Sequence, residues 1–464
     1  MAVSEILVIF ADVSISICWE TEQTACRLRC GPDLSFPLNR KRPMRALLPL
    51  FFFIVVYLVS SIVAGDFYKV PITVAFMLTA IVAVATSRGR LSKRLERFTR
   101  GAAEPNLLLM IWIFVLAGAF ANSAKEMGSI SDMVNLTLSV VPSDALLAGI
   151  FIAAALISLS IGTSVGTIVA LTPIAIGMAE TMNVSTAMLT AIVVGGSFFG
   201  DNLSFISDTT VVATQSQGVR MSDKFRTNVR IALPAALLMV AVYAFQGREL
   251  TVPTNLPAVD FLKVMPYIVV LVAAACGVNV LFVLCLGILL TGGVGMISGD
   301  YDFYSWFAAM GNGVSGMGEL IIITMLAGGI LEIVRSNGGI RYIMRKVLSH
   351  VNSQRSAELS IAALVSLVDL CTANNTVAII TVSGIARDIS RKFSLDPKQV
   401  ASILDTFSCT MQGIIPYGAQ LLMAAGLAKC SPVSLMPYLY YPVTLGLFAL
   451  LAILIRKSKP QEKA

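Results

Sequence analysis

The sequence predicts an all-α polytopic membrane protein, and three observations support that fold class. Of the 464 residues, 56% are hydrophobic and only 13% are charged, and the mean hydropathy is +0.81. A soluble protein of this length carries far more charge on its surface. Apolar runs of the kind that cross a bilayer as helices recur along the chain, for example at 46–63, 107–120 and 435–455. These runs are continuous and do not alternate as the strands of a membrane β-barrel do.

We expect about 12–14 membrane segments, some of them broken or re-entrant, arranged as two five-segment repeats of inverted topology. The expected segments are 45–65, 70–87, 106–124, 144–162, 164–182, 187–218 with a break, 231–246, 265–277, 279–298, 317–334, 357–371, 373–386, 399–424 and 434–455. The expected organisation is an extension (1–43), two leading helices (44–105), repeat 1 (106–250), linking helices (251–315), repeat 2 (316–456) and a tail (457–464).

The net charge of +7 is concentrated in four short loops and the C-terminal tail, as is typical of cytoplasmic connections and not of a nucleic-acid-binding protein. If loop 88–104 is cytoplasmic, alternation places the other basic loops and the C-terminus on the same side. Loops 127–143, 247–264 and 299–304 then face outward. We therefore expect a multi-pass protein of the inner (plasma) membrane with both termini in the cytoplasm.

Residues 1–43 differ from the rest of the chain. The apolar stretch 6–18 is short, contains Asp12 and lacks the basic segment that begins a signal peptide. Met44 is followed by Arg45 and a strong apolar run, as at a natural start of translation. We interpret residues 1–43 as a disordered or mis-annotated extension.

An internal repeat is visible in the sequence. The residues LAGA at 116–119 recur about 210 residues later as LAGG at 326–329, and TSVGT at 163–167 corresponds to TANNT at 372–376. Because each predicted repeat has an odd number of segments, the second copy must be inverted in the membrane. Inverted repeats are typical of secondary transporters, which bind substrates near the membrane midplane. Chance similarity between helices rich in small residues is the alternative.

Several other classes of protein are disfavoured. Cys26 and Cys30 have no matching pair to complete a zinc site, four other cysteines lie in apolar segments, and His350 is the only histidine. No G-x-x-x-x-G-K-[ST] or G-x-S-x-G motif is present. We therefore expect no enzyme activity and no cofactor. The expected partners are the lipid bilayer, Na+ and H+, with no nucleic acid and with a homodimer as an open alternative.

The densest polar cluster lies at 195–210, directly after a strong apolar run. Charges within apolar segments are costly and usually functional. Asp201 and Asp208 are seven residues apart, which would place them on one helix face, and glycines at 195, 196 and 200 would loosen the helix. The alternative is a surface loop with Asp208 as a helix N-cap. The candidate ligands are Asp201, Asn202, Ser207, Asp208, Thr209 and Thr210.

A second polar cluster follows the apolar run 361–368. Its oxygen-bearing side chains favour a hairpin tip deep in the membrane, although hydrogen bonding between helices is the alternative. Sodium is expected at Asp201, Asp208 and Asn375. The candidates in the second cluster are Asp369, Thr372, Asn374, Asn375 and Thr376. Weaker candidates, at the repeat-related positions, are Thr163, Ser164, Thr167, Asp405 and Gln412, with Pro416 as a break.

The run from Phe198 to Thr210 (FFGDNLSFISDTT) resembles the signature of NhaC-type Na+/H+ antiporters, as do TANNT at 372–376 and the small-residue helix at 326–340. The similarity covers nearly everything after Met44. Phe205 stands where many relatives have proline. The resemblance implies a transporter fold with inverted repeats and re-entrant hairpins. It also implies either Na+/H+ exchange or the exchange of organic acids with sodium or protons.

We expect sodium and protons to compete for one carboxylate site. An aspartate removed from water holds a proton more tightly, and sodium then displaces that proton as the protein alternates between its two open states. The alternative is a sodium- or proton-coupled carrier of organic acids such as malate or lactate. Such a carrier needs a basic residue at its site, and the sequence places no Lys or Arg near the two polar clusters.

Overall fold

The computed structural model describes residues 46–60, 71–205, 207–248, 250, 257–348 and 351–456. The extension 1–43, the tail 457–464, His350 and Cys26 and Cys30 lie outside the described residues. Residues Pro43–Ala464 group into one compact unit. Every regular element within the described ranges is a helix, so the all-α prediction is confirmed.

The first half of the chain begins with two leading membrane segments and a basic amphipathic helix. These elements are α2 (Leu48–Ile54), which continues as the π-helix η2 (Val55–Val59), α4 (Ile72–Thr86) and α5 (Leu91–Ala102). The elements that follow are α6 (Pro105–Glu126), α7 (Ser129–Val140), the 3-10 turn η3 (Ser143–Ala145), α8 (Leu146–Ile161), α9 (Ser164–Met182), α10 (Thr186–Leu203), α11 (Asp208–Gln217) and α12 (Met221–Gly247).

Three helices link the two halves: α13 (Phe261–Ala275), α14 (Val280–Ser298) and α15 (Phe303–Gly316). The second half comprises α16 (Gly318–Ser336), α17 (Gly339–Leu348), α18 (Gln354–Thr372), α19 (Asn375–Lys392), α20 (Pro397–Gln412), α21 (Ala419–Leu427), α22 (Pro432–Leu435), the 3-10 turn η4 (Met436–Tyr438) and α23 (Tyr440–Ile455).

Seven helical stretches in the described residues are long and apolar enough to cross a membrane, and an eighth is gained if α21 and the α22–η4 segment, bent by 96°, form one broken span. Four further apolar helices are shorter. The prediction of 12–14 segments exceeds the seven or eight full spans. Helices form at 357–371, 373–386 and 399–424 as expected, but α18, α19 and α20 carry charged residues such as Glu358, Asp369 and Asp405.

Four stretches outside the expected segments contain helices. Loop 88–104 contains α5, loop 127–143 contains α7, the stretch 299–316 contains α15, and the basic segment after residue 335 contains α17. In α5, Leu91 and Leu95 alternate with basic residues at helical spacing, so the segment is amphipathic and not apolar. A search for membrane spans therefore misses it.

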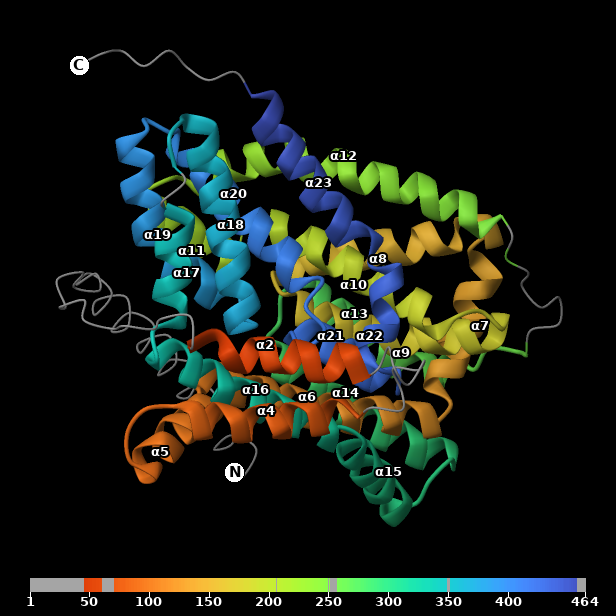
Figure 1. Cartoon of the computed structure of the whole chain (residues 1–464). Helices are drawn as coiled ribbons and strands as arrows, with labels where there is room; N and C mark the ends of the chain where they lie inside the picture. The colour runs from red at the N-terminus through yellow and green to blue at the C-terminus, as the bar shows by residue number, and fades with distance from the viewer. Residues whose placement is uncertain are drawn as a thin grey trace, which may run out of the picture. The chain divides into compact units, whose positions relative to one another are not determined.

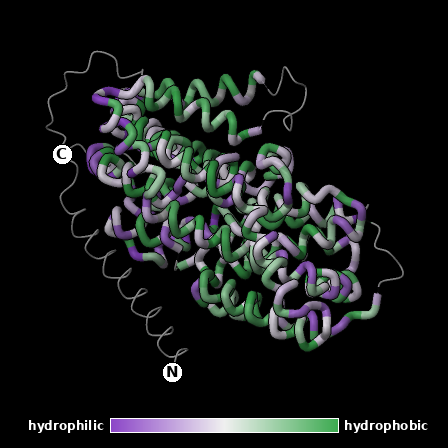
Figure 2. The backbone as a smooth tube through the Cα atoms, turned by 90° about the horizontal axis from the view of Figure 1, so that it is seen from below, coloured by the Kyte–Doolittle hydropathy of each residue, from purple (hydrophilic) through white to green (hydrophobic). Residues whose placement is uncertain are grey.

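The outer surface is apolar, as expected for a protein that contacts lipid. Large side chains such as Trp112, Leu237 and Leu289 are exposed on the helices. Figure 2 shows hydrophobic residues along most of the helical tube, with the hydrophilic ones gathered mainly near its turns and ends. The chain is thus a multi-span membrane protein.

The two halves repeat one order of elements. Each half begins with a long helix and a short one, which are α6 and α7 in the first half and α16 and α17 in the second. A tight hairpin follows, α8–α9 or α18–α19. A broken helix, α10–α11 or α20–α21, and a final helix, α12 or α23, complete each half. Both hairpin tips contain a left-handed residue, Gly162 (φ 74°) and Ala373 (φ 48°), just before the second helix begins. The inverted orientation of the halves in the membrane stays a prediction.

The two halves are interlocked through their broken helices (Figure 1). From the first half, α11 packs against α19 and α20, whereas α21 of the second half packs against α9 and α10. Each half therefore supplies a short helix to the core of the other. The two breaks and the two hairpin tips meet at this interface, and the polar side chains described below lie there.

Candidate functional site

The break in the first broken helix separates the two predicted carboxylates. Helix α10 ends at Leu203 and α11 begins at Asp208. The Ser204 hydroxyl donates to the Leu159 carbonyl oxygen at 3.0 Å, which fixes the end of α10 to α8. The prediction that Asp201 and Asp208 share one helix face is wrong, because the chain leaves the helix between them. The predicted break itself is present.

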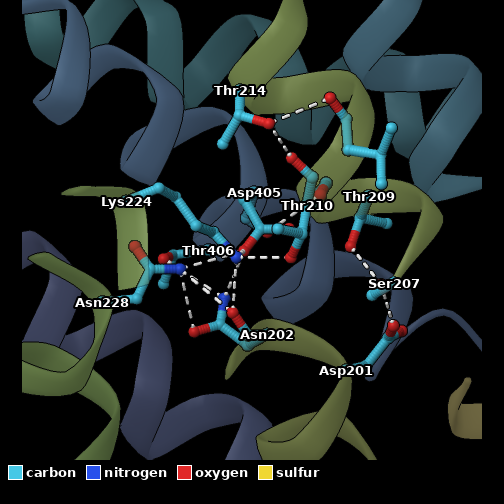
Figure 3. Close-up of polar contacts among 12 residues, drawn as sticks. Asp201, Asn202, Ser207, Thr209, Thr210, Thr214, Lys224, Asn228, Asp405 and Thr406 are labelled. Carbon is cyan, nitrogen blue, oxygen red and sulfur yellow. Dashed lines mark hydrogen bonds and ion pairs between the residues drawn. The ribbon is translucent and has the colours of Figure 1, made fainter. Parts of the chain in front are cut away.

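Asp201 is buried at the end of α10, with 5% of its surface exposed. One carboxylate oxygen accepts a hydrogen bond from Ser207 in the break at 2.5 Å, and the other accepts one from Ser164 at the start of α9 at 3.0 Å. Ser207 in turn contacts the Thr209 hydroxyl at 2.9 Å (Figure 3). Two segments of the first half therefore donate hydroxyl hydrogen bonds to one buried carboxylate, and Thr209 contacts one of the two donors.

A chain of side-chain amides connects Asp201 to the hairpin tip of the second half. Gln420 on α21 donates to the Ser164 hydroxyl at 3.0 Å. Gln412 at the end of α20 donates to the Gln420 side-chain oxygen at 2.8 Å and to the Ala373 carbonyl oxygen at 3.1 Å. The two polar clusters predicted from the sequence are thus joined through both breaks.

A second buried carboxylate, Asp405 of α20, lies close enough to Asp201 for their charges to interact. Its Oδ2 atom lies 2.6 Å from the Lys224 ammonium. The same oxygen accepts hydrogen bonds from Asn228 at 2.9 Å and Asn202 at 3.0 Å (Figure 3). Asn202 also donates to Thr406 at 3.3 Å. Helices α10, α12 and α20 meet at this ion pair.

Lys224 overturns the expectation that no Lys or Arg lies near the polar clusters. Only 1% of it is exposed. The sequence conceals this role, because Arg220, Arg226 and Arg230 surround Lys224 in a segment that resembles a cytoplasmic loop. A usable signal was present: Lys224 and Asn228 are four residues apart and continue the buried face of α12 through Ile231, Ala235, Met239 and Tyr243.

The remaining candidates of the first cluster have different surroundings. Asp208 is exposed in the first turn of α11, although its charge reaches Asp201. Thr210 is buried and accepts a hydrogen bond from Lys224 at 2.6 Å. Thr167 bonds the Thr163 carbonyl oxygen within its own helix, at 3.3 Å. The role of Asp208 in binding sodium stays a prediction.

Asp369 is fully buried in the last turn of α18. Its carboxylate interacts with the backbone amides of Asn374 and Gln412, but neither oxygen accepts a well-aligned hydrogen bond from the described residues, and Oε1 of Gln412 also lacks a partner there. Burial of a charged carboxylate in this position costs free energy unless the carboxylate binds a proton or a cation. Asp369 is therefore the candidate of the second cluster whose surroundings point to a bound cation or proton.

The other residues of the second cluster shape the hairpin tip. Asn374 caps α19 by accepting a hydrogen bond from the Val377 amide at 3.0 Å. Thr372 donates to the Asn374 carbonyl oxygen at 3.2 Å, and the Asn375 side chain accepts from the Thr376 amide at 3.0 Å. Within the described ranges, no group of three His, Cys, Asp or Glu residues could hold a metal ion.

Interlocked halves with broken helices and buried carboxylates at their interface define a membrane transporter and not an enzyme. The chain belongs to the Na+/H+ antiporter family, which matches residues 44–248 and 245–456.

Three relatives align with most of the chain at low sequence identity. The Na+/H+ antiporter NhaC of Bacillus subtilis is 24% identical over 77% of this chain and 84% of its own length. NhaC of Alkalihalophilus pseudofirmus is 21% identical over 75% and 83%. The malate-2H+/Na+-lactate antiporter of Bacillus subtilis is 22% identical over 74% and 80%. The predicted resemblance to the NhaC-type family is confirmed.

Two solved transporters align along most of the chain. The YdaH transporter of Alcanivorax borkumensis is 12% identical, with a TM-score of 0.40, over 88% of this chain and 97% of its own. MtrF of Neisseria gonorrhoeae is also 12% identical, with a TM-score of 0.39, over 90% and 96%.

Proposed function

We propose that the protein is a secondary active antiporter that exchanges Na+ for H+ at Asp201. The observation that carries this proposal is the position of that carboxylate. It is buried at the break of α10–α11, bonded to two hydroxyls, and connected through Gln420 and Gln412 to the opposite hairpin tip. A conformational change that moves either half would alter the surroundings of this group.

The chemistry of the site suits a competition between the two ions. A buried carboxylate is stable only when its charge is compensated. A proton on Asp201 achieves this, and so does a sodium ion held by the carboxylate and by the hydroxyl oxygens of Ser164 and Ser207. Oxygen ligands of this kind suit hard monovalent cations. Because both ions neutralise the same group, binding of one releases the other, which couples their transport.

Asp369 supplies a further group that requires compensation, at the second hairpin tip. No side chain and no cation compensates its charge among the described residues, and only the backbone amides of Asn374 and Gln412 interact with it. We propose that Asp369 binds a proton or a sodium ion in the same cycle. Asn375 and Thr376 stay candidate ligands at this tip.

The test is a pH-gradient assay in everted membrane vesicles. In the wild type, addition of Na+ should dissipate the proton gradient. Asp201→Asn should abolish this response, because the amide has nearly the same shape but binds neither a proton nor sodium in the required way. Asp388, exposed on α19, provides the matched control, and Asp388→Asn should retain exchange. Full exchange in Asp201→Asn with an unaltered pH profile would disprove the proposal.

Exchange of organic acids is the second candidate function, and the buried Lys224 is the observation that favours it. A basic group at the interface of the two halves could attract a substrate carboxylate, and one relative is named as a malate/lactate antiporter. In this structure, however, Asp405 neutralises the ammonium. The same vesicles should therefore be tested with malate and lactate in turn. A sodium response that requires one of these acids would favour this function over simple Na+/H+ exchange.

A further inference from the structure

The ammonium of Lys224 lies in a cage of three oxygen atoms. The Asp405 carboxylate, the Asn202 carbonyl oxygen and the Thr210 hydroxyl each lie 2.6 Å from Nζ. An ammonium has three N–H groups, and all three are used here by the protein. Both Lys224 and Asp405 are at most 1% exposed.

The three oxygens come from elements that only this fold brings together. Asn202 is in the last turn of α10, where a helix leaves its carbonyl oxygens without partners inside the helix. Thr210 lies in the first turn of α11, beyond the break, and Asp405 comes from α20 of the second half. Asn228 supports the cage by donating to the Asn202 carbonyl oxygen at 3.2 Å and to Asp405 at 2.9 Å.

The composition of this cage is that of a sodium site. One carboxylate, one backbone carbonyl at a helix break and one hydroxyl are hard oxygen ligands, and their total charge of −1 matches a monovalent cation. The bound cation here is part of the chain. We propose that Asp405, the Asn202 carbonyl and Thr210 form a second monovalent-cation site, which the ammonium of Lys224 occupies as a tethered cation.

A cation that is part of the chain limits how many free ions the two carboxylates Asp201 and Asp405 can bind. Asp201 and Asp405 carry two potential negative charges, and Lys224 permanently compensates the one on Asp405. Of these two carboxylates, only Asp201 is then left for a mobile ion. This inference builds on the proposed exchange at Asp201, but the preference of the cage for a cation can be measured without any transport.

The experiment removes the tethered cation and offers a free one. The Asp201→Asn background eliminates sodium binding at the proposed exchange site. In that background, Lys224→Ala should leave an unpaired carboxylate beside an empty cage. Purified protein should then show a saturable rise in melting temperature of about 5 °C or more with NaCl or LiCl, because a ligand that binds only the folded state stabilises it. Choline chloride at equal ionic strength should give no such rise. The Asp201→Asn protein with Lys224 present gives the baseline in NaCl, because any sodium bound at Asp369 contributes equally to both proteins.

Adding Asp405→Asn serves as the control. This triple variant should fold without sodium and should lose the response, because the charge that holds the cation is gone. Equal melting temperatures in sodium and choline for the Lys224→Ala variant would overturn the proposal. The proposal would also be overturned if that variant unfolded in every salt while the triple variant folded, since the lysine would then only compensate a charge. Retained transport by Asp201→Asn would refute the exchange proposal but not the cage.

Discussion

Two aspartates of one sequence motif have different surroundings in the structure. Asp201 is buried between two serine hydroxyls, whereas Asp208 lies exposed in the first turn of α11. The four residues Ser204–Ser207 between the helices cause this difference, because they turn the chain out of α10 before Asp208 is reached. We therefore assign the proposed exchange to Asp201 and not to Asp208.

For Asp208 we predict a modest effect on exchange. An acidic residue in the first turn of a helix interacts favourably with the helix dipole, by about 0.3–1 kcal/mol. If the loss of this interaction were felt entirely in sodium binding, the apparent sodium affinity would change by at most about fivefold. Asp208→Asn should therefore keep exchange, with a sodium half-saturation within about fivefold of the wild type in the vesicle assay. Loss of exchange as complete as in Asp201→Asn would show that Asp208 binds the ion directly.

For Asp369 we predict that function and stability respond in opposite directions. Asp369→Asn removes a buried charge that no cation and no well-aligned hydrogen bond compensates among the described residues. It should reduce exchange at least about tenfold, while thermal stability in sodium-free buffer stays equal or rises.

The comparison for this prediction is Asp405→Asn, which leaves Lys224 buried and unpaired and should destabilise the protein by about 3–5 kcal/mol. Thermal unfolding in detergent measures both variants. If Asp369→Asn were as unstable as Asp405→Asn, Asp369 would have a structural partner.

At the residue scale, the sequence predicted which polar side chains belong to the site better than it predicted which residues they bond. Asp201, Ser207 and Gln412 were recognised because polar groups within apolar segments are conspicuous. The connection between Asp201 and Gln412 through Ser164 and Gln420 was not predicted, since the Gln420–Ser164 bond joins residues 256 positions apart. Lys224 was missed because a basic residue near a helix end normally faces water. Only the periodicity of buried positions along α12 distinguishes it.

At the scale of helices, apolar composition predicted most spans, and the glycine- and serine-rich segment correctly predicted the break in α10–α11. Three of the four helices that were missed, α5, α7 and α17, have a polar face and lie in predicted loops. Hydrophobicity alone cannot separate such helices from loops, because their stability comes from packing one face against the bundle. For example, Phe98 of α5 packs against Gly329 of α16.

The close approach of α8 and α10 depends on Gly200. A Cβ atom at this position would lie 2.3 Å from the Leu159 amide nitrogen and 2.4 Å from the Ser158 Cβ. We predict that Gly200→Ala separates the helices, costs about 1–3 kcal/mol, and lowers exchange by displacing the adjacent Asp201. Thermal unfolding and the vesicle assay measure the two effects.

The matched variant for this test is Gly293→Ala, in the middle of α14, where a Cβ would have no heavy atom within 4 Å. That change should be neutral or slightly stabilising, because alanine favours a helix more than glycine does. Equal behaviour of the two variants would mean that the contact between α8 and α10 can relax without cost.

At the scale of the whole molecule, we predict that both termini face the cytoplasm. Single cysteines at Ser131 on α7 and Ser92 on α5, both exposed positions, should then differ in their reaction with an impermeant thiol reagent applied to intact cells. The probe at Ser131 should react and that at Ser92 should not. Reaction at Ser92 alone would reverse the orientation that was assigned from the basic loops and would remove the support for inverted repeats.

The interlocking of the halves has a consequence for how the protein is made. Helix α11 packs against α19 and α20, which leave the ribosome more than a hundred residues later. Until then its buried face, including Ala213 and Thr214, has no native neighbour. We therefore expect the newly inserted first half to stay incompletely packed, and to depend on lipid or on membrane chaperones, until synthesis of the second half is nearly complete.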